Sequence, residues 1–135
     1  MTLIICADDR GGMAFNRRRQ SQDRIVREHI LADAAGGQLW MRPYSARQFG
    51  PEQANHISAD EDFLEKAGEA DTCFLELSDP AAALARADRL IVYRWNRTYP
   101  FDLAVALPPE GWTLAGTEEF SGHSHEKITK EVYTR

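Results

Sequence analysis

The segment TLIICADDRGGMAFNRRRQSQD, residues 2–23, joins an apolar run to a polar stretch with paired glycines and three consecutive arginines. The apolar run is short and is followed by charged and glycine residues, a pattern typical of a fully buried strand. A flexible loop is expected from Asp8 to about Arg19. A helix is expected from Ser21, with Ser21 as its N-cap and Asp23 in its positive first turn.

The rest of the chain continues to alternate strand and helix signals. Further short strands are expected at residues 38–41, 55–58, 72–77 and 89–95. Between them, a helical turn starts at Pro43, and an S-x-x-E capping box from Ser58 to Glu61 opens a helix that ends at Gly68. Ser78 or Asp79 is expected to cap another helix, with Pro80 in its first turn.

The end of the chain has a different rhythm. A long proline-bearing connection follows residue 96, and two alternating segments, residues 112–120 and 126–134, are expected to pair as an antiparallel hairpin. The whole order predicts an α/β fold. We expect a single three-layer domain over residues 1–135, with a mainly parallel sheet, helices on both faces and a C-terminal antiparallel hairpin.

Composition and charge exclude some classes of protein. The chain has 135 residues, 43% hydrophobic and 27% charged, with a net charge of −5, which argues against disorder and against a basic duplex-binding surface. Six arginines nevertheless gather between residues 10 and 27. Cys6 and Cys73 lie in apolar runs and are expected to be buried thiols. No membrane span and no signal peptide are evident, so a cytoplasmic protein without membrane contacts is expected.

The basic loop has the composition of a ligand site. In open α/β sheets, ligands bind beyond the carboxyl ends of the strands, where this loop leaves the first strand. Arg18 and Arg19 could bind phosphate or carboxylate, and Asp23 could accept a hydrogen bond or carry a proton. The loop predicts a small ligand with an anionic end and a polar ring. The alternative is that the segment is an ordinary exposed loop and that Asp23 simply stands at the start of a helix. The glycines of the loop match neither the G-x-G-x-x-G nor the G-x-x-x-x-G-K-[ST] pattern of nucleotide-binding loops.

Taken together, these segments resemble dihydrofolate reductase in a shortened form. LIICADDRGGMAFNRRR…D is similar to that family's first strand, active-site loop and helix acid, and LWMRPYSARQF, residues 39–49, to its M-G-R-x-T-x-x-S stretch. ADRLIVYRW…TYPFD…GWTLAGTEEF…HEKITKEVYTR, from residue 87 onward, is similar to its last three strands. The resemblance rests on order and spacing. It implies a dihydrofolate reductase-like fold, a pterin- or nucleotide-like ligand, and NADPH as a cofactor.

The resemblance also assigns site residues on this sequence. Asp23 takes the acidic pterin-binding and proton-relay position, which makes it the candidate catalytic residue. Arg42 and Ser45 fall where the family contacts the cofactor phosphates. The candidate substrate-binding residues lie in the loop: Gly12, Met13, Asn16, Arg18 and Arg19. The chain departs from the family at two places. The L-P-W motif that follows the loop in the family is missing here, and SDPAAAL, residues 78–84, replaces the glycine pair that lets the cofactor approach in the family.

The loop is also similar to that of short chains labelled ribonuclease Z, but the histidines do not support a zinc-dependent ribonuclease. That class needs an H-x-H-x-D-H cluster, and this sequence has only one doublet, His123 and His125. A zinc site needs three or four ligands. No metal is therefore expected, and the segment GHSHE is interpreted as a polar turn.

Two functions stay open at this point. In the first, a small molecule binds over the end of the first strand; if the protein is a reductase, NADPH donates hydride and Asp23 assists protonation. In the second, a non-catalytic protein uses the arginine patch Arg17–Arg19 to bind RNA or an acidic partner. Nucleophilic catalysis has no support in the sequence, because Ser21 and Ser45 have no evident base.

Overall fold

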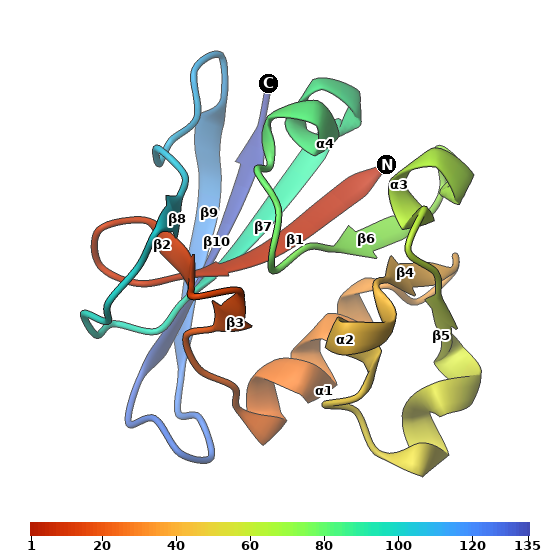
Figure 1. The fold of residues 1–135 in the computed structure, drawn as a ribbon. Helices are drawn as coiled ribbons and strands as arrows, with labels where there is room; N and C mark the ends of the chain where they lie inside the picture. The colour runs from red at the N-terminus through yellow and green to blue at the C-terminus, as the bar shows by residue number, and fades with distance from the viewer.

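The computed structural model describes residues 1–135 and is built around one seven-stranded sheet (Figure 1). The strand order is β5-β4-β6-β1-β7-β10-β9. The first five strands in this order are parallel, and β10 pairs antiparallel with both β7 and β9. The strands are β1 (Thr2–Ala7), β4 (Leu39–Met41), β5 (Ile57–Ala59), β6 (Thr72–Phe74), β7 (Arg89–Arg94), β9 (Thr113–Phe120) and β10 (Ile128–Thr134). The predicted α/β fold with a C-terminal antiparallel hairpin is confirmed.

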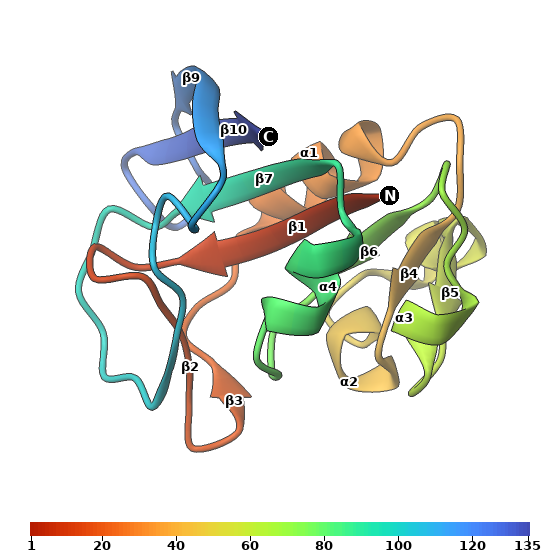
Figure 2. The same ribbon diagram turned by 90° about the horizontal axis from the view of Figure 1, so that it is seen from above.

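Helices cover both faces of the sheet, as Figure 2 shows for α1 (Arg24–Asp33) and α4 (Ala81–Arg86) on opposite sides of β1. The alternation of side chains along β1 explains the two layers. Ile4 packs with Val26 of α1, whereas Leu3 packs with Ala83 of α4. The other helices are α2 (Pro43–Ala46), η1 (Pro51–His56) and α3 (Phe63–Lys66). None of these helices is long and apolar enough to cross a membrane.

The segment expected to be a flexible loop after β1 is instead a hairpin. β2 (Gly12–Phe15) pairs with β3 (Arg18–Arg19) and with β8 (Leu103–Ala104) in a second, three-stranded sheet. Asn16 and Arg17 form the turn with φ values of 52° and 61°, and positive φ at both positions is the requirement of a type I′ turn. The loop prediction was wrong because the partner β8 lies far away in the sequence, where no local pattern announces the pairing.

Two predicted helix starts were also wrong. The N-cap of α1 is Asp23, not Ser21: the Asp23 carboxylate accepts the backbone N–H groups of Ile25 and Val26 at 2.8 and 3.4 Å. Ser58 does not cap α3. Ser58 instead belongs to strand β5, and its hydroxyl donates a hydrogen bond to the Gln38 side chain.

The N-cap of α4 is Pro80 and not Ser78 or Asp79, and of the two thiols expected to be buried only Cys73 is so, since Cys6 is half-buried. The Asp79 carboxylate accepts the N–H of Ala81 at 2.9 Å, just before the first turn of α4. Cys6 and Cys73 are both free, and Cys73 is fully buried. The Asp79 contact and the buried Cys73 follow from short-range patterns, which explains why the sequence revealed them.

Candidate functional site

The β2–β3 hairpin is anchored over the carboxyl end of β1 by Asp8, which is completely buried. Its carboxylate accepts hydrogen bonds from the backbone N–H groups of Arg10, Gly12 and Tyr99 and from the Gln20 amide, at 2.8 to 3.1 Å. Burial raises the pKa of Asp8, but these donors outweigh burial and lower it below the ordinary range. Asp8 is therefore an ionised structural anchor that fixes the hairpin above the sheet edge.

Arg19, at the end of the hairpin, forms a bidentate ion pair with Glu76, just beyond the end of β6. Arg19 Nε and Nη2 donate to the two Glu76 oxygens at 3.0 and 3.2 Å, and the Glu76 side chain is only 6% exposed. Gln48 Nε2 donates to the same carboxylate at 3.2 Å. The Arg19 guanidinium also lies 4.3 Å from the centroid of the Tyr44 ring, so it is held on two sides.

Two cavities share Arg19 as a wall. One, of about 390 Å³, lies between β3 and α2 and is lined by Arg19, Gln22, Tyr44, Arg47 and Gln48. The other, of about 280 Å³, lies along the hairpin and is lined by Phe15, Asn16, Arg18, Arg19, Gln20, Tyr99 and Pro100. The first cavity lies at the carboxyl edge of the parallel strands, where ligands of open α/β sheets bind.

The five candidate substrate-binding residues divide into two groups. Asn16, Arg18 and Arg19 line the cavities described above. Gly12 and Met13 do not: both are buried, and Met13 packs into the core on the α4 face of the sheet. A Cβ at Gly12 would lie 2.6 Å from the Gln20 Nε2 and 2.9 Å from Asp8 Oδ2, so this glycine permits the close packing of the hairpin.

The two candidate cofactor residues are both largely engaged or buried. Arg42 donates through Nε and Nη2 to Glu61 Oε2, and Ser45 is only 1% exposed. At the start of α4, where the glycine pair is missing, the Asp79 carboxylate already accepts the Ala81 N–H. On the Arg42 guanidinium, which the resemblance assigns to the cofactor phosphates, Nη1 is the nitrogen without a protein partner.

Asp23 is buried and lines neither Arg19 cavity. Its carboxylate caps α1 and also accepts the backbone N–H groups of His123 and Ser124, at 3.0 and 2.8 Å. Its Oδ2 lies 2.9 Å from His125 Nδ1. Burial raises the pKa of Asp23, but the His123 N–H, the His125 ring and the Ser124 N–H hold it well below its ordinary range. Both carboxylate oxygens thus accept several hydrogen bonds from groups of the chain itself.

Several site residues were not anticipated from the sequence. Glu76 sits in the apolar segment TCFLEL, and a carboxylate inside such a run was the available signal for a buried charge. Tyr44 and Gln48 carry no local signal, because they meet Arg19 only in the folded chain. His125 was interpreted as part of a polar turn, yet it is 5% exposed and bonded to Asp23.

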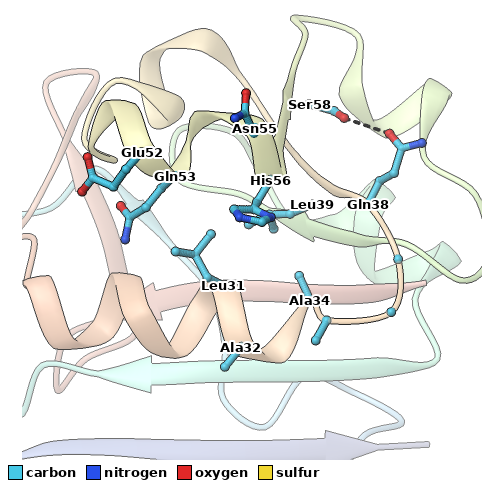
Figure 3. Close-up of a pocket in the computed structure, with 13 residues that line it drawn as sticks. Leu31, Ala32, Ala34, Gln38, Leu39, Glu52, Gln53, Asn55, His56 and Ser58 are labelled. Atoms are coloured by element: carbon cyan, nitrogen blue, oxygen red, sulfur yellow. Dashed lines mark hydrogen bonds between the residues drawn. The ribbon is translucent and has the colours of Figure 1, made fainter.

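The largest cavity, of about 720 Å³, lies away from this site, between the C-terminal end of α1, the start of β4 and η1 (Figure 3). His56 and Leu39 lie at its centre, and Ser58 donates a hydrogen bond to Gln38 at its rim. The only carboxylate in its lining is Glu52, which is exposed. No buried ionisable group converges there, so we assign no chemistry to it.

Comparisons with known proteins support the fold and little else. No protein-family model and no curated protein matches this sequence. Solved structures do match the fold. The dihydrofolate reductase from Enterococcus faecalis, solved in complex with NADP(H) and RAB-propyl, has a TM-score of 0.70 over 99% of this chain and 95% of that chain, at 11% sequence identity. The dihydrofolate reductase-like fold is therefore confirmed, and at this identity the likeness carries no activity.

Proposed function

We propose that this chain, which has the fold of dihydrofolate reductase, binds a small molecule with an anionic group in the cavity between β3 and α2. The observation that carries the proposal is that Arg19 and Tyr44 line this cavity while Glu76, behind them, holds Arg19 in a bidentate ion pair. Its volume of about 390 Å³ is within the usual range for small-molecule sites, roughly 300–1,000 Å³.

The charges in the cavity favour an anion. Glu76 neutralises Arg19, whereas Arg47 is exposed and makes no ion pair, so one positive charge is left for a ligand. Tyr44 offers an aromatic ring, and Gln22 and Gln48 offer amide groups that could hydrogen-bond a polar ring. These groups support the expected combination of an anionic end and a polar, pterin- or nucleotide-like ring.

NADPH-dependent reduction, with Asp23 as its proton donor, stays a prediction. It is supported by the fold and by the nucleotide bound to the Enterococcus faecalis structure. Against it, Arg42 is paired with Glu61 and Ser45 is buried, and both Asp23 oxygens already accept several donors of the chain. The buried carboxylate of Glu76 holds Arg19 and Gln48, two residues that line the cavity, in place through its hydrogen bonds.

The proposal is tested by thermal unfolding with NADPH, NADH, folate, dihydrofolate or inorganic phosphate, each at millimolar concentration. A ligand present at about 100 times its Kd adds roughly 2.7 kcal/mol to stability, which raises Tm by several degrees. Arg47→Gln is expected to weaken the response about tenfold in Kd, because it removes the unpaired charge.

Arg89→Gln is the matched control. Arg89 is exposed and makes no ion pair, and it lies at the N-terminal end of β7, whereas the cavity lies at the carboxyl ends of the strands. Its response should equal that of the wild type. Binding that Arg47→Gln leaves unchanged would place the ligand elsewhere, and no response to any of the five compounds would contradict this ligand class.

RNA binding by the Arg17–Arg19 patch is the second candidate, favoured by the exposed side chains of Arg17 and Arg18 at the hairpin turn. Arg19 does not belong to a free patch, since it is paired with Glu76. With two free arginines, log affinity for single-stranded RNA should fall with log salt at a slope of about −1.4, or −0.7 per phosphate. Affinity that is independent of salt would exclude this function.

A further inference from the structure

Ser21, His125 and Asp23 form a continuous hydrogen-bonded series, although they come from opposite ends of the sequence. Ser21 Oγ lies 2.9 Å from His125 Nε2, and His125 Nδ1 lies 2.9 Å from Asp23 Oδ2. Both ring nitrogens are engaged: Nε2 by Ser21 Oγ and, at the longer distance of 3.4 Å, by the Tyr99 hydroxyl, and Nδ1 by the Asp23 carboxylate, with Ser124 Oγ at 3.2 Å. A nucleophile, a base and an orienting acid are arranged in this way in serine-based acyl transfer.

The Asp23 carboxylate determines the direction of these hydrogen bonds. It is ionised, because the N–H donors around it lower its pKa, and an ionised carboxylate only accepts hydrogen bonds. His125 Nδ1 therefore carries the proton that is donated to Asp23. In the neutral ring Nε2 is then an acceptor, and the Ser21 hydroxyl donates to it. This is the tautomer that a general base needs in order to remove the hydroxyl proton.

The fold holds the His125 ring in place from several sides. The Trp95 ring stacks on it, with centroids 4.7 Å apart and planes inclined by 26°. The Gly122 N–H donates to the His125 carbonyl at 3.0 Å, and a Cβ at Gly122 would lie 2.7 Å from Asp23 Oδ2. His125 is 5% exposed, so the base is shielded from water, and Ser21 is half-buried.

A polar cavity of about 460 Å³ lies against His125. It contains no apolar side chain, and its lining consists of Arg97, Ser121, Gly122, His123, Ser124, His125 and Glu126. Arg97 is exposed and makes no ion pair, so it is free to bind an anionic group. Ser21 is not one of the lining residues, and the cavity adjoins it through His125, to which the Ser21 hydroxyl is bonded. The polar lining fits a small polar ester and does not fit the alkyl chain of a lipid.

We propose that Ser21 and His125 are the catalytic residues of a site that hydrolyses small polar esters. Ser21 Oγ bonds to the carbonyl carbon while His125 Nε2 takes the hydroxyl proton. The bond from that carbon to the alcohol oxygen then breaks, and the alcohol leaves with the proton from His125. Water attacks the acyl-serine, gives a proton to His125, and the acid leaves as Ser21 recovers that proton. Asp23 exchanges no proton and is a positioning residue.

The first experiment treats the intact protein with a fluorophosphonate and maps the modified residue by mass spectrometry. The Ser21 oxygen should bond to phosphorus as fluoride leaves, with the hydroxyl proton passing through His125. We expect modification at Ser21 and no labelling of Ser21→Ala. A wild-type protein that stays unlabelled, or is labelled at another residue, would overturn the proposal without reference to any variant.

The second experiment follows release of p-nitrophenol from p-nitrophenyl acetate. The activity should disappear in Ser21→Ala and fall by about 100-fold or more in His125→Gln. Ser58→Ala is the matched control, because Ser58 lies in the distant strand β5 and bonds only to Gln38. Circular dichroism confirms that each variant is folded. Hydrolysis that survives Ser21→Ala at the wild-type rate contradicts the proposal.

The role of Asp23 is tested by Asp23→Asn, which should reduce the hydrolysis rate by roughly 10⁴-fold because the ring loses its tautomer. A purely structural role could also reduce the rate, so the readout is the ¹⁵N NMR spectrum of His125. The wild type should carry its proton on Nδ1, and Asp23→Asn should shift it to Nε2. An unchanged tautomer in a folded variant would remove Asp23 from the mechanism.

Discussion

The carboxylate of Asp23 binds two parts of the chain at once. One oxygen accepts the N–H groups that begin α1, and both oxygens accept N–H groups from the connection between β9 and β10. Residues about 100 positions apart in the sequence are thereby joined at one side chain. A charge in this position stabilises the helix start and the distant loop together.

Asp23→Asn is expected to lower the free energy of unfolding by about 2–4 kcal/mol at pH 7, because buried N–H donors lose a charged acceptor. The pKa of Asp23 is depressed in the folded protein, so its contribution is complete above the unfolded pKa of about 3.9 and is lost as pH falls further. Urea denaturation at several pH values should show the difference between wild type and variant shrinking below about pH 4. A difference that persists undiminished to roughly pH 2 would contradict this origin.

The ion pair between Arg19 and Glu76 makes a second prediction at this scale. The side chains are 18% and 6% exposed, so removing one charge leaves the other largely desolvated. In a double-mutant cycle with Arg19→Met and Glu76→Leu, we expect a coupling energy of about 1–3 kcal/mol. The exposed pair of Arg42 and Glu61 is the control, with coupling below about 1 kcal/mol. Equal coupling in the two pairs would show that the buried pair is not special.

Among the elements, the β2–β3 hairpin depends on one position that accepts no side chain. Gly12→Ala should destabilise the protein by about 1–3 kcal/mol, because its Cβ would overlap the Gln20 amide and the Asp8 carboxylate. Gly116→Ala in β9 is the matched control: no atom lies within 4 Å of a Cβ there, and the change should stay within about 0.5 kcal/mol. Similar losses in the two variants, measured by urea denaturation, would argue against tight packing at Gly12.

The sequence revealed the elements whose signals are local. β1 and β7 are apolar runs buried on both faces, and the Asp79 carboxylate accepts the Ala81 N–H only two residues along the chain. The β2–β3 hairpin escaped because its pairing with β8 is long-range. The sequence did not predict the residues around Arg19 in the ligand cavity for the same reason, since Glu76 and Tyr44 contact Arg19 only after folding. The base of Ser21 was missed because His125 lies 104 positions away.

For the whole molecule, we propose that residues 1–135 unfold as one cooperative unit. Two core clusters lie on opposite faces of the same sheet, and β1 contributes to both, so neither can be lost while β1 stays paired. Calorimetry should show one transition, with an enthalpy of about 95 kcal/mol near 60 °C from roughly 0.7 kcal/mol per residue. A van't Hoff enthalpy well below the calorimetric value, or two separate transitions, would show that the chain contains independent units.

The position of β1 between β6 and β7 has a consequence for how the protein is made. A ribosome produces β1 long before either neighbour, and at about 5–20 residues per second the strand waits several seconds for residues 72–94 to appear. During that time the apolar side chains of Leu3, Ile4 and Ile5, which are fully covered in the finished fold, have no sheet to join. Until the second half of the chain has been synthesised, β1 therefore remains an unpaired apolar segment that is open to wrong partners.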